Sequence, residues 1–287
     1  DDLSISTRRI KSFSVIKKYF AIIYMPKCLK MRDASDNYTI KKTDIFSLPM
    51  RVLAIGRTGC GKSSVALGNL LLRNEFYRKD FKPDNIYVFS GSLKGDLKLQ
   101  IIVEELDLPK CNLFDTFDEN VAHMIYDNAV DNYKEAVSNN ETPEHILFIF
   151  DDLGFTNLQN KNKKNSILDK IFSNGRKYLI SIITCNQRMT QLSTNAREQA
   201  SGLMLWSSTN KQLELVENDF NYLSEGGGKT PKRRFLEMVK NHTQNIHDFI
   251  VFDLGKKEMY RNKDFKPICI CTDGTNKCGG SIVPPED

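Results

Sequence analysis

"AIGRTGCGKSSV", residues 54–65, decides the fold expected of this chain. Within it, Gly56, Gly61, Lys62 and Ser63 have the spacing GxxxxGK[ST] of a phosphate-binding loop, directly after a strand-like apolar run. Glycines let backbone N–H groups turn inward around phosphates, the lysine reaches the β/γ oxygens, and the serine hydroxyl can ligate Mg²⁺. A plain glycine-rich turn is the alternative, but a chance match has a probability on the order of 1% when glycine makes up about 7% of residues. The stretch therefore predicts nucleotide binding.

The loop predicts a site for ATP together with Mg²⁺. Lys62 is expected to act in catalysis as well as in binding, because it reaches the phosphate oxygens, and Ser63 is expected to ligate the metal ion. The residues expected to bind the nucleotide are Gly56, Arg57, Thr58, Gly59, Cys60, Gly61, Lys62, Ser63 and Ser64.

The bulk composition is that of an ordinary globular protein. The 287 residues are 27% charged and 40% hydrophobic, with a formal net charge of +5. This mildly basic balance is compatible with nucleic-acid binding but does not require it. No apolar run approaches the roughly 18 residues that a membrane span needs, so we expect a soluble chain without a membrane partner. The seven cysteines are odd in number and scattered, which favours reduced thiols in a cytosol-like compartment.

Apolar, strand-like runs alternate with longer amphipathic stretches from residue 50 onward. This alternation is typical of an α/β fold with a mainly parallel sheet and helices on both faces. The expected strands are 51–56, 85–90, 146–151, 179–185, 202–207 and 248–253. The expected helices are about 62–75, 95–106, 118–138, 164–174, 194–200, 210–223 and 232–241.

Composition divides the chain into three segments. Residues 1–48 mix basic pairs with one apolar stretch, which indicates an N-terminal arm or small subdomain that either contacts phosphates or is simply solvated. Residues 49–273 form the expected P-loop domain. Residues 274–287 are expected to be a frayed tail. Because the first residue is Asp rather than Met, we expect a fragment or a processed form.

"HILFIFDDLG", residues 145–154, is the second informative stretch. Five apolar residues ending in two aspartates indicate a buried central strand whose carboxylates emerge at its carboxyl end, where ligands bind in open α/β sheets. Asp151 is expected to hold Mg²⁺, most simply through water, and Asp152 to orient or deprotonate the attacking water. A helix cap or turn is the alternative for two aspartates after a strand.

The order of the strands discriminates among P-loop folds. One further strand lies between the loop helix and the 146–151 strand, and the 179–185 strand follows and ends near Asn186 and Gln187. This is the layout of the additional-strand, RecA-like class, in which a polar sensor touches the γ-phosphate region, and a nucleotide kinase would lack that sensor strand. Gln187 or Asn186 suits this role because an amide can bond both a phosphate and a water. Two surface amides are the plainer interpretation.

Four stretches occur in this order along the chain: MRVLAIGRTGCGKS (50–63), LFIFDDLG (147–154), SNGRKYLISIITCNQ (173–187) and TNAREQA (194–200). In order and spacing they resemble the viral genome-packaging ATPases of the FtsK–HerA superfamily, in the branch used by poxviruses, giant viruses and virophages. The resemblance covers about residues 45–255 and implies an ATP-driven motor that moves double-stranded DNA into a preformed capsid. Asp152 departs from the pattern, because relatives often have Glu there, and the shorter side chain must reach water differently.

The resemblance also implies partners and a location. It implies a homo-oligomeric ring of five or six subunits, double-stranded DNA as substrate, a capsid vertex protein as docking partner, and a place in the host-cell cytoplasm or viral factory, or on the virion. Two rival functions remain: a P-loop nucleotide or small-molecule kinase, and a scaffold that binds ATP but barely hydrolyses it. DNA-stimulated ATPase activity separates the three.

A ring ATPase needs a cation from the neighbouring subunit to stabilise the transition state. Arg176 stands just before the sensor strand and matches the "GR" position of the resemblance, so it is the preferred arginine finger. Arg197, on the short helix after the sensor strand, is the competing candidate.

Two late stretches carry weaker hypotheses. "SEGGGKTPKRRF", residues 224–235, predicts a flexible basic loop that tracks a DNA backbone by charge, or else a solvated hinge. Its DNA-binding candidates are Lys229, Lys232, Arg233 and Arg234. Near the C-terminus, Cys269, Cys271 and Cys278 form a poor zinc pattern, because C-x-C spacing is unusual and the fourth ligand is unclear even with His242 and His247 upstream.

Overall fold

The computed structural model describes residues 33–43, 45–153, 166–223, 228–256 and 259–268. Backbone contacts divide the chain after Asp33, and the described residues from Ala34 onward belong to one compact unit. Ile45, Phe46 and Leu48 are buried in the core of this unit, so the packed domain begins before position 49. The expected tail at 274–287 lies outside the described residues. Among the described residues, no helix is both long and apolar enough to span a membrane.

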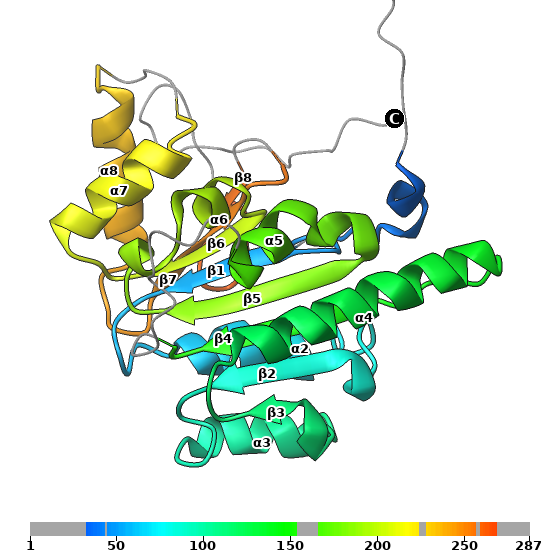
Figure 1. The fold of residues 1–287 in the computed structure, drawn as a ribbon. Helices are drawn as coiled ribbons and strands as arrows, with labels where there is room; N and C mark the ends of the chain where they lie inside the picture. Colours follow the sequence, from blue (N-terminus) through cyan, green and yellow to red (C-terminus); the bar gives the residue numbers. More distant parts are fainter. Residues whose placement is uncertain (1–32, 44, 154–165, 224–227, 257–258, 269–287) are drawn as a thin grey trace, which may run out of the picture. The chain divides into compact units, whose positions relative to one another are not determined.

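A mixed sheet with strand order β3-β2-β4-β5-β1-β6-β7-β8 forms the centre of the unit (Figure 1). The pairings from β3 through β6 are parallel, whereas β7 runs antiparallel to β6 and β8 antiparallel to β7. The strands are β1 Arg51–Ile55, β2 Ile86–Ser90, β3 Leu113–Phe114, β4 Ile146–Asp151, β5 Ile180–Asn186, β6 Gly202–Trp206, β7 Phe249–Asp253 and β8 Met259–Arg261. All six expected strands are therefore present, and β3 and β8 are additional.

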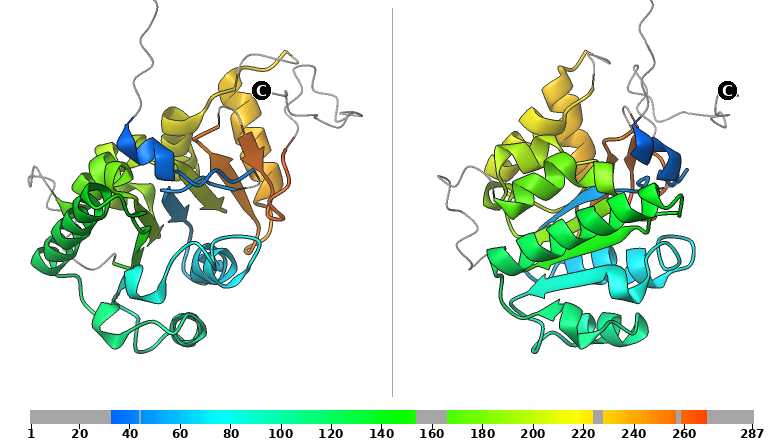
Figure 2. Two further views of the ribbon diagram at one scale, coloured as in Figure 1. Left: turned by 90° about the vertical axis from the view of Figure 1, so that its right-hand side faces the viewer. Right: turned by 45° about the vertical axis from the view of Figure 1, so that its right-hand side comes forward.

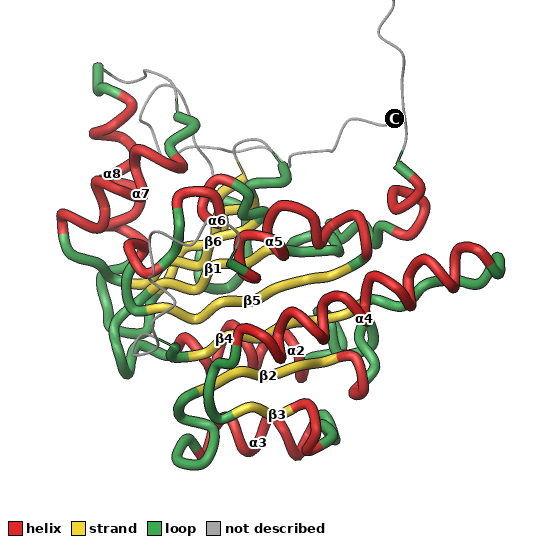
Figure 3. Tube along the Cα trace, viewed as in Figure 1, coloured by secondary structure: helices red, strands yellow, loops and turns green. Residues whose placement is uncertain are grey.

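Helices cover both faces of the sheet, as predicted (Figures 2 and 3). The helices are η1 Ala34–Tyr38, η2 Ser63–Asn69, α2 Leu70–Leu72, η3 Pro83–Asn85, α3 Leu97–Glu105, η4 Lys110–Asn112, α4 Glu119–Ser138, α5 Ile167–Asn174, η6 Gly175–Tyr178, η7 Met189–Gln191, α6 Thr194–Glu198, α7 Asn210–Phe220 and α8 Pro231–His242. One core packs α4, α5, α6, α7 and α8 against the sheet, and the other packs η2, α2 and α3 against the opposite face. Segment η2 is a π-helix rather than the α-helix expected there, a form that often marks functional sites.

Strand β4 shows why the sequence contains continuous apolar runs. Both faces of β4 are covered, so Phe148 and Phe150 enter one core while Leu147 and Ile149 enter the other. The aromatic rings of Phe89, Phe148 and Phe150 stack beside one another in the first core. Because β5 lies between β1 and β4, the phosphate-binding loop and the two aspartates are one strand apart at the same edge of the sheet.

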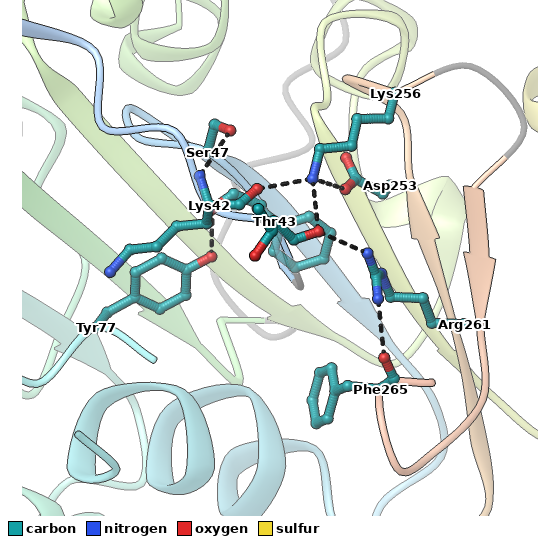
Figure 4. A network of polar contacts seen from close by, with 9 residues as sticks. Lys42, Thr43, Ser47, Tyr77, Asp253, Lys256, Arg261 and Phe265 are labelled. Carbon is teal, nitrogen blue, oxygen red and sulfur yellow. Dashed lines mark hydrogen bonds and ion pairs between the residues drawn. The ribbon is translucent and has the colours of Figure 1, made fainter. Parts of the chain in front are cut away.

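At the opposite edge, basic side chains fasten the segment before β1 to the antiparallel strands (Figure 4). Lys256 donates hydrogen bonds to the carbonyls of Lys42 and Thr43 at 2.7 and 3.0 Å, and Arg261 donates to the Thr43 carbonyl at 2.9 Å. Arg261 is only 2% exposed. We call this set of bonds the clasp: it ties residues 42–43 to β8 and to the turn after β7.

Candidate active site

The phosphate-binding loop connects β1 to η2, and its glycines are required by close approach and by backbone conformation. A Cβ on Gly56 would lie 2.7 Å from both Cys60 Sγ and Trp206 Cβ. Gly59 and Gly61 have φ of +78° and +100°, which favours glycine. The spacing of the motif thus reflects where the backbone turns.

Lys62 folds back over the loop. Its ammonium donates hydrogen bonds to the carbonyls of Gly56 at 2.8 Å and Arg57 at 3.0 Å. In this position Lys62 lines the cavity above the loop. The acceptors of the lysine are therefore neutral carbonyls and not a carboxylate, so they would compete only weakly with a phosphate for this cation.

A cavity of about 250 Å³ lies over the loop and joins it to the ends of β4 and β5. Its lining residues are Thr58, Gly59, Gly61, Lys62, Ser63, Ser64, Ser92, Asp96, Lys98, Asp151, Asp152 and Gln187. Of the residues predicted to bind nucleotide, Gly56, Arg57 and Cys60 do not line this cavity, and Cys60 is buried. Sequence reasoning missed Ser92, Asp96 and Lys98, which follow β2 and reach the cavity because β2 pairs with β4.

Ser63 and Asp151 face each other across the cavity. The Ser63 hydroxyl lies 3.2 Å from Asp151 Oδ1 and 3.4 Å from Oδ2. Burial raises the pKa of Asp151 to about 6, and the Ser63 hydrogen bond opposes that rise. A hydroxyl and a carboxylate in contact are hard oxygen donors of the kind that Mg²⁺ prefers, so the residues fit this ion.

Asp152 and Gln187 form a second pair beside the first. Gln187 Nε2 donates a hydrogen bond to Asp152 Oδ1 at 3.2 Å. Asp152 has φ of +47°, a left-handed conformation that costs energy for a residue other than glycine and is typical of functional sites. The Gln187 turn is fixed by Gln191, whose Oε1 accepts from the backbone N–H groups of Gln187 and Arg188 at 2.8 and 3.0 Å. Asn186 does not line the cavity, and its buried side-chain oxygen meets no donor among the described residues.

The two candidate arginine fingers lie in different surroundings. Arg176 lies in η6, before β5 and therefore at the opposite edge of the sheet from the loop, and its side chain is 58% exposed. It pairs with Asp36 at 3.0 Å. Arg197 is buried: Nη1 lies 2.9 Å from Asp219 Oδ2, and Nη2 donates to Thr194 Oγ1. Arg176 is thus available to another molecule, whereas Arg197 is engaged within its own subunit.

Of the basic stretch 224–235, residues 231–235 belong to α8, in agreement with the helix expected at 232–241, and residues 224–227 lie outside the described residues. Thr230 caps α8, so three of the four candidate cations lie in its first turn. Lys229 and Arg233 both pair with Glu237, at 2.6 and 3.0 Å. Lys232 lies 3.9 Å from Glu217. The α8 cations, by which we mean Lys229, Lys232, Arg233 and Arg234, therefore form a partly neutralised surface rather than a freely moving loop.

A second cavity, of about 830 Å³, adjoins the first and shares Thr58 and Gln187 with it. Three cations line it, namely Arg57, Arg188 and Lys211, together with side chains of α7. This cavity was not predicted from the sequence, because its walls come from the phosphate-binding loop, the segment after β5 and α7, which are far apart in the chain.

The zinc hypothesis falls outside what the structure describes. Cys269, Cys271 and Cys278 are not among the described residues. Within the described ranges, no three His, Cys, Asp or Glu side chains gather in a way that could hold a metal ion.

With this geometry established, comparison with known proteins identifies the family. The family model described as Poxvirus A32 protein matches residues 38–276. The chain belongs to this family. The match confirms the resemblance to the poxvirus branch that the sequence motifs indicated. No curated protein matches the chain at a significant level.

Comparison with solved structures shows that this chain shares its fold with B204, a protein of known structure. The genome packaging NTPase B204 from Sulfolobus turreted icosahedral virus 2, in complex with AMP, has a TM-score of 0.51 at 13% identity, over 77% of this chain and 99% of B204. Its AMPPCP complex gives a TM-score of 0.49 at 14% identity, over 75% and 97% of the two chains. EssC (ATPases 2 and 3) from Geobacillus thermodenitrificans gives 0.45 at 15% identity, over 58% and 34%. The predicted fold class, a P-loop α/β fold, is confirmed.

Proposed function

We propose that this member of the poxvirus A32 protein family is a viral genome-packaging ATPase, which hydrolyses ATP to drive double-stranded DNA into a preformed capsid. The observation that carries the proposal is the convergence of Lys62, the Ser63–Asp151 pair and the Asp152–Gln187 pair on one cavity. Phosphoryl transfer to water needs such parts: a phosphate cradle, a metal site and a group that orients the water. B204, which shares the fold, is described as a genome packaging NTPase and was solved with AMP.

Each part has its own task in this proposal. Mg²⁺, held by Ser63 and Asp151, would supply positive charge to the β/γ oxygens. Lys62 exchanges the carbonyls of its own loop for phosphate oxygens when ATP binds, so the loop gains a cation without unpairing a carboxylate. Asp152 accepts the proton of the lytic water, and Gln187 holds Asp152 and the water in place through its amide.

The motor function requires contributions from neighbours and from DNA. We propose a homo-oligomeric ring in which the exposed Arg176 reaches the γ-phosphate of the adjacent subunit, after exchanging Asp36 for that phosphate. The α8 cations are proposed to follow the DNA backbone by charge alone. Docking to a capsid vertex protein, in the cytoplasm or viral factory, completes the proposal.

The deciding experiment is ATPase activity measured with and without double-stranded DNA, together with the oligomeric mass under each condition. The proposal predicts turnover that DNA stimulates and that Lys62→Ala abolishes. A kinase would transfer phosphate to an acceptor without DNA stimulation, and a scaffold would bind ATP with negligible turnover. A strict monomer in all conditions would contradict the ring.

A further inference from the structure

The segment between α8 and β7 lies against the phosphate-binding loop. His247 Nδ1 is 3.2 Å from the carbonyl oxygen of Cys60, and a Cβ on Gly61 would lie 3.7 Å from the same nitrogen. In Figure 1 this segment and the chain leaving β1 meet at the edge of the sheet to which the β1 and β5 arrows point. His247 is exposed and is used by none of the catalytic pairs described above.

The direction of a bound nucleotide follows from the strand order. The γ-phosphate must lie near Asp151, Asp152 and Gln187, which follow β4 and β5. Because β1 lies between β5 and β6, the opposite end of the phosphate chain points toward β6 and β7. The nucleoside, attached to the α-phosphate, therefore leaves the loop on the side where His247 stands.

The segment that carries His247 is firmly held. Asp248 Oδ2 accepts hydrogen bonds from the Asn245 backbone and side chain at 3.1 and 2.6 Å, and Asp248 Oδ1 accepts from Lys263 at 2.8 Å. The next residue, Phe249, stacks on Trp206 of β6 with ring centroids 4.9 Å apart. A ring held in this way can form a binding surface without a large loss of conformational freedom.

The chemistry of the two exposed side chains suits a nucleoside. A carbonyl oxygen only accepts, so His247 Nδ1 donates to Cys60, which leaves the other edge and the two faces of the exposed ring to meet a ligand. Ile246, the preceding residue, is 60% exposed and offers an aliphatic side chain to a ligand. We propose that His247 and Ile246 hold the nucleoside of the bound nucleotide, with the imidazole against the base or ribose. This assignment rests on the proposed ATPase function and adds a recognition element to it.

The test compares ATP with inorganic tripolyphosphate, which has the phosphates but no nucleoside. His247→Ala should weaken ATP binding roughly 5- to 150-fold, the range expected for stacking of one base, and leave tripolyphosphate binding within about twofold. His247→Gln keeps an N–H donor that can reach the Cys60 carbonyl, so it should show the same selective loss. Ile246→Ser, at an exposed position where folding is not at risk, should show a smaller selective loss. His242→Ala, on α8, is the matched control and should bind both ligands as the wild type does.

Two results would overturn the assignment. Equal losses for ATP and tripolyphosphate would mean that His247 only supports the loop through Cys60, and no loss for either would mean that the nucleoside lies elsewhere. Failure of the ATPase proposal is recognised separately, because then the wild-type protein would bind ATP without hydrolysing it while the nucleoside selectivity could still be measured.

Discussion

Removing the charge of Asp151 should stabilise the protein while destroying its metal site. Burial raises the pKa of this carboxyl from its ordinary value of 3.8 to about 6. Between these values the native state keeps a proton that the unfolded chain has lost, so stability falls as pH rises through this window and stays lower above it. A rise of about two units corresponds to roughly 3 kcal/mol at 1.36 kcal/mol per unit.

Asp151→Asn removes that cost and retains an oxygen that can accept the Ser63 hydrogen bond. In chelator and without nucleotide, the variant should therefore gain about 3 kcal/mol at pH 7 to 8, or about 6–12 °C in Tm for a domain of this size. The gain should shrink as pH falls below about 6 and disappear below the ordinary pKa of 3.8. Denaturant and thermal unfolding across this pH range measure it.

Asp152→Asn is the matched control. Asp152 is only partly buried, so the burial cost that acts on Asp151 is smaller there and no comparable gain is expected. With Mg²⁺ and ATP the order should reverse, because the wild type gains a bound metal and the Asp151→Asn variant does not. A variant that is less stable than the wild type at pH 7.5, or a difference that does not change with pH, would refute the reasoning.

Three further predictions follow from the same site and its surroundings. Asp152→Asn should keep ATP and Mg²⁺ binding and lose hydrolysis, measured by calorimetry and phosphate release; equal loss of nucleotide affinity in this variant and in Asp151→Asn would contradict their separate roles. Replacing the α8 cations by alanine should lower the slope of log K for DNA against log salt by at most about 0.9 per lost phosphate contact, whereas Glu237→Gln, which frees two of the cations, should strengthen DNA binding. Arg176→Ala should bind ATP but hydrolyse it very slowly, and mixing it with Lys62→Ala chains should restore part of the activity; a mixture that stays inactive although hetero-oligomers form would remove Arg176 from the mechanism.

The elements that the sequence predicted well are those buried on both faces. The β4 run of apolar residues could hardly be anything but a central strand, and its two final aspartates had to emerge at the ligand-binding edge. By contrast, β3 has two residues and β8 has three. Such short strands show no recognisable alternation of apolar and polar residues. The π-helical form of η2 is also invisible in composition, because the same residues suit an α-helix.

The parts of the site that were missed depend on packing between distant segments. Ser92 and Lys98 line the cavity only because β2 pairs with β4, and strand pairing cannot be read from one sequence. Arg197 forms an ion pair with Asp219, 22 residues later in the chain. Its burial could therefore not be predicted from the sequence either. The start of α8 was predicted to within one residue, and Thr230 followed by proline is a helix-start pattern.

The clasp determines how mechanical force enters the domain. A pull on the chain upstream of Ile40 is shared between the Ile40–Leu48 backbone pair and residues 42–43, whose carbonyls are bound by Lys256 and Arg261. Part of the tension therefore passes to β8 and the turn after β7, on the far side of β6, instead of arriving at β1 alone. Since the phosphate-binding loop is the direct continuation of β1, the clasp reduces the share of a pull on the N-terminal segment that reaches this loop.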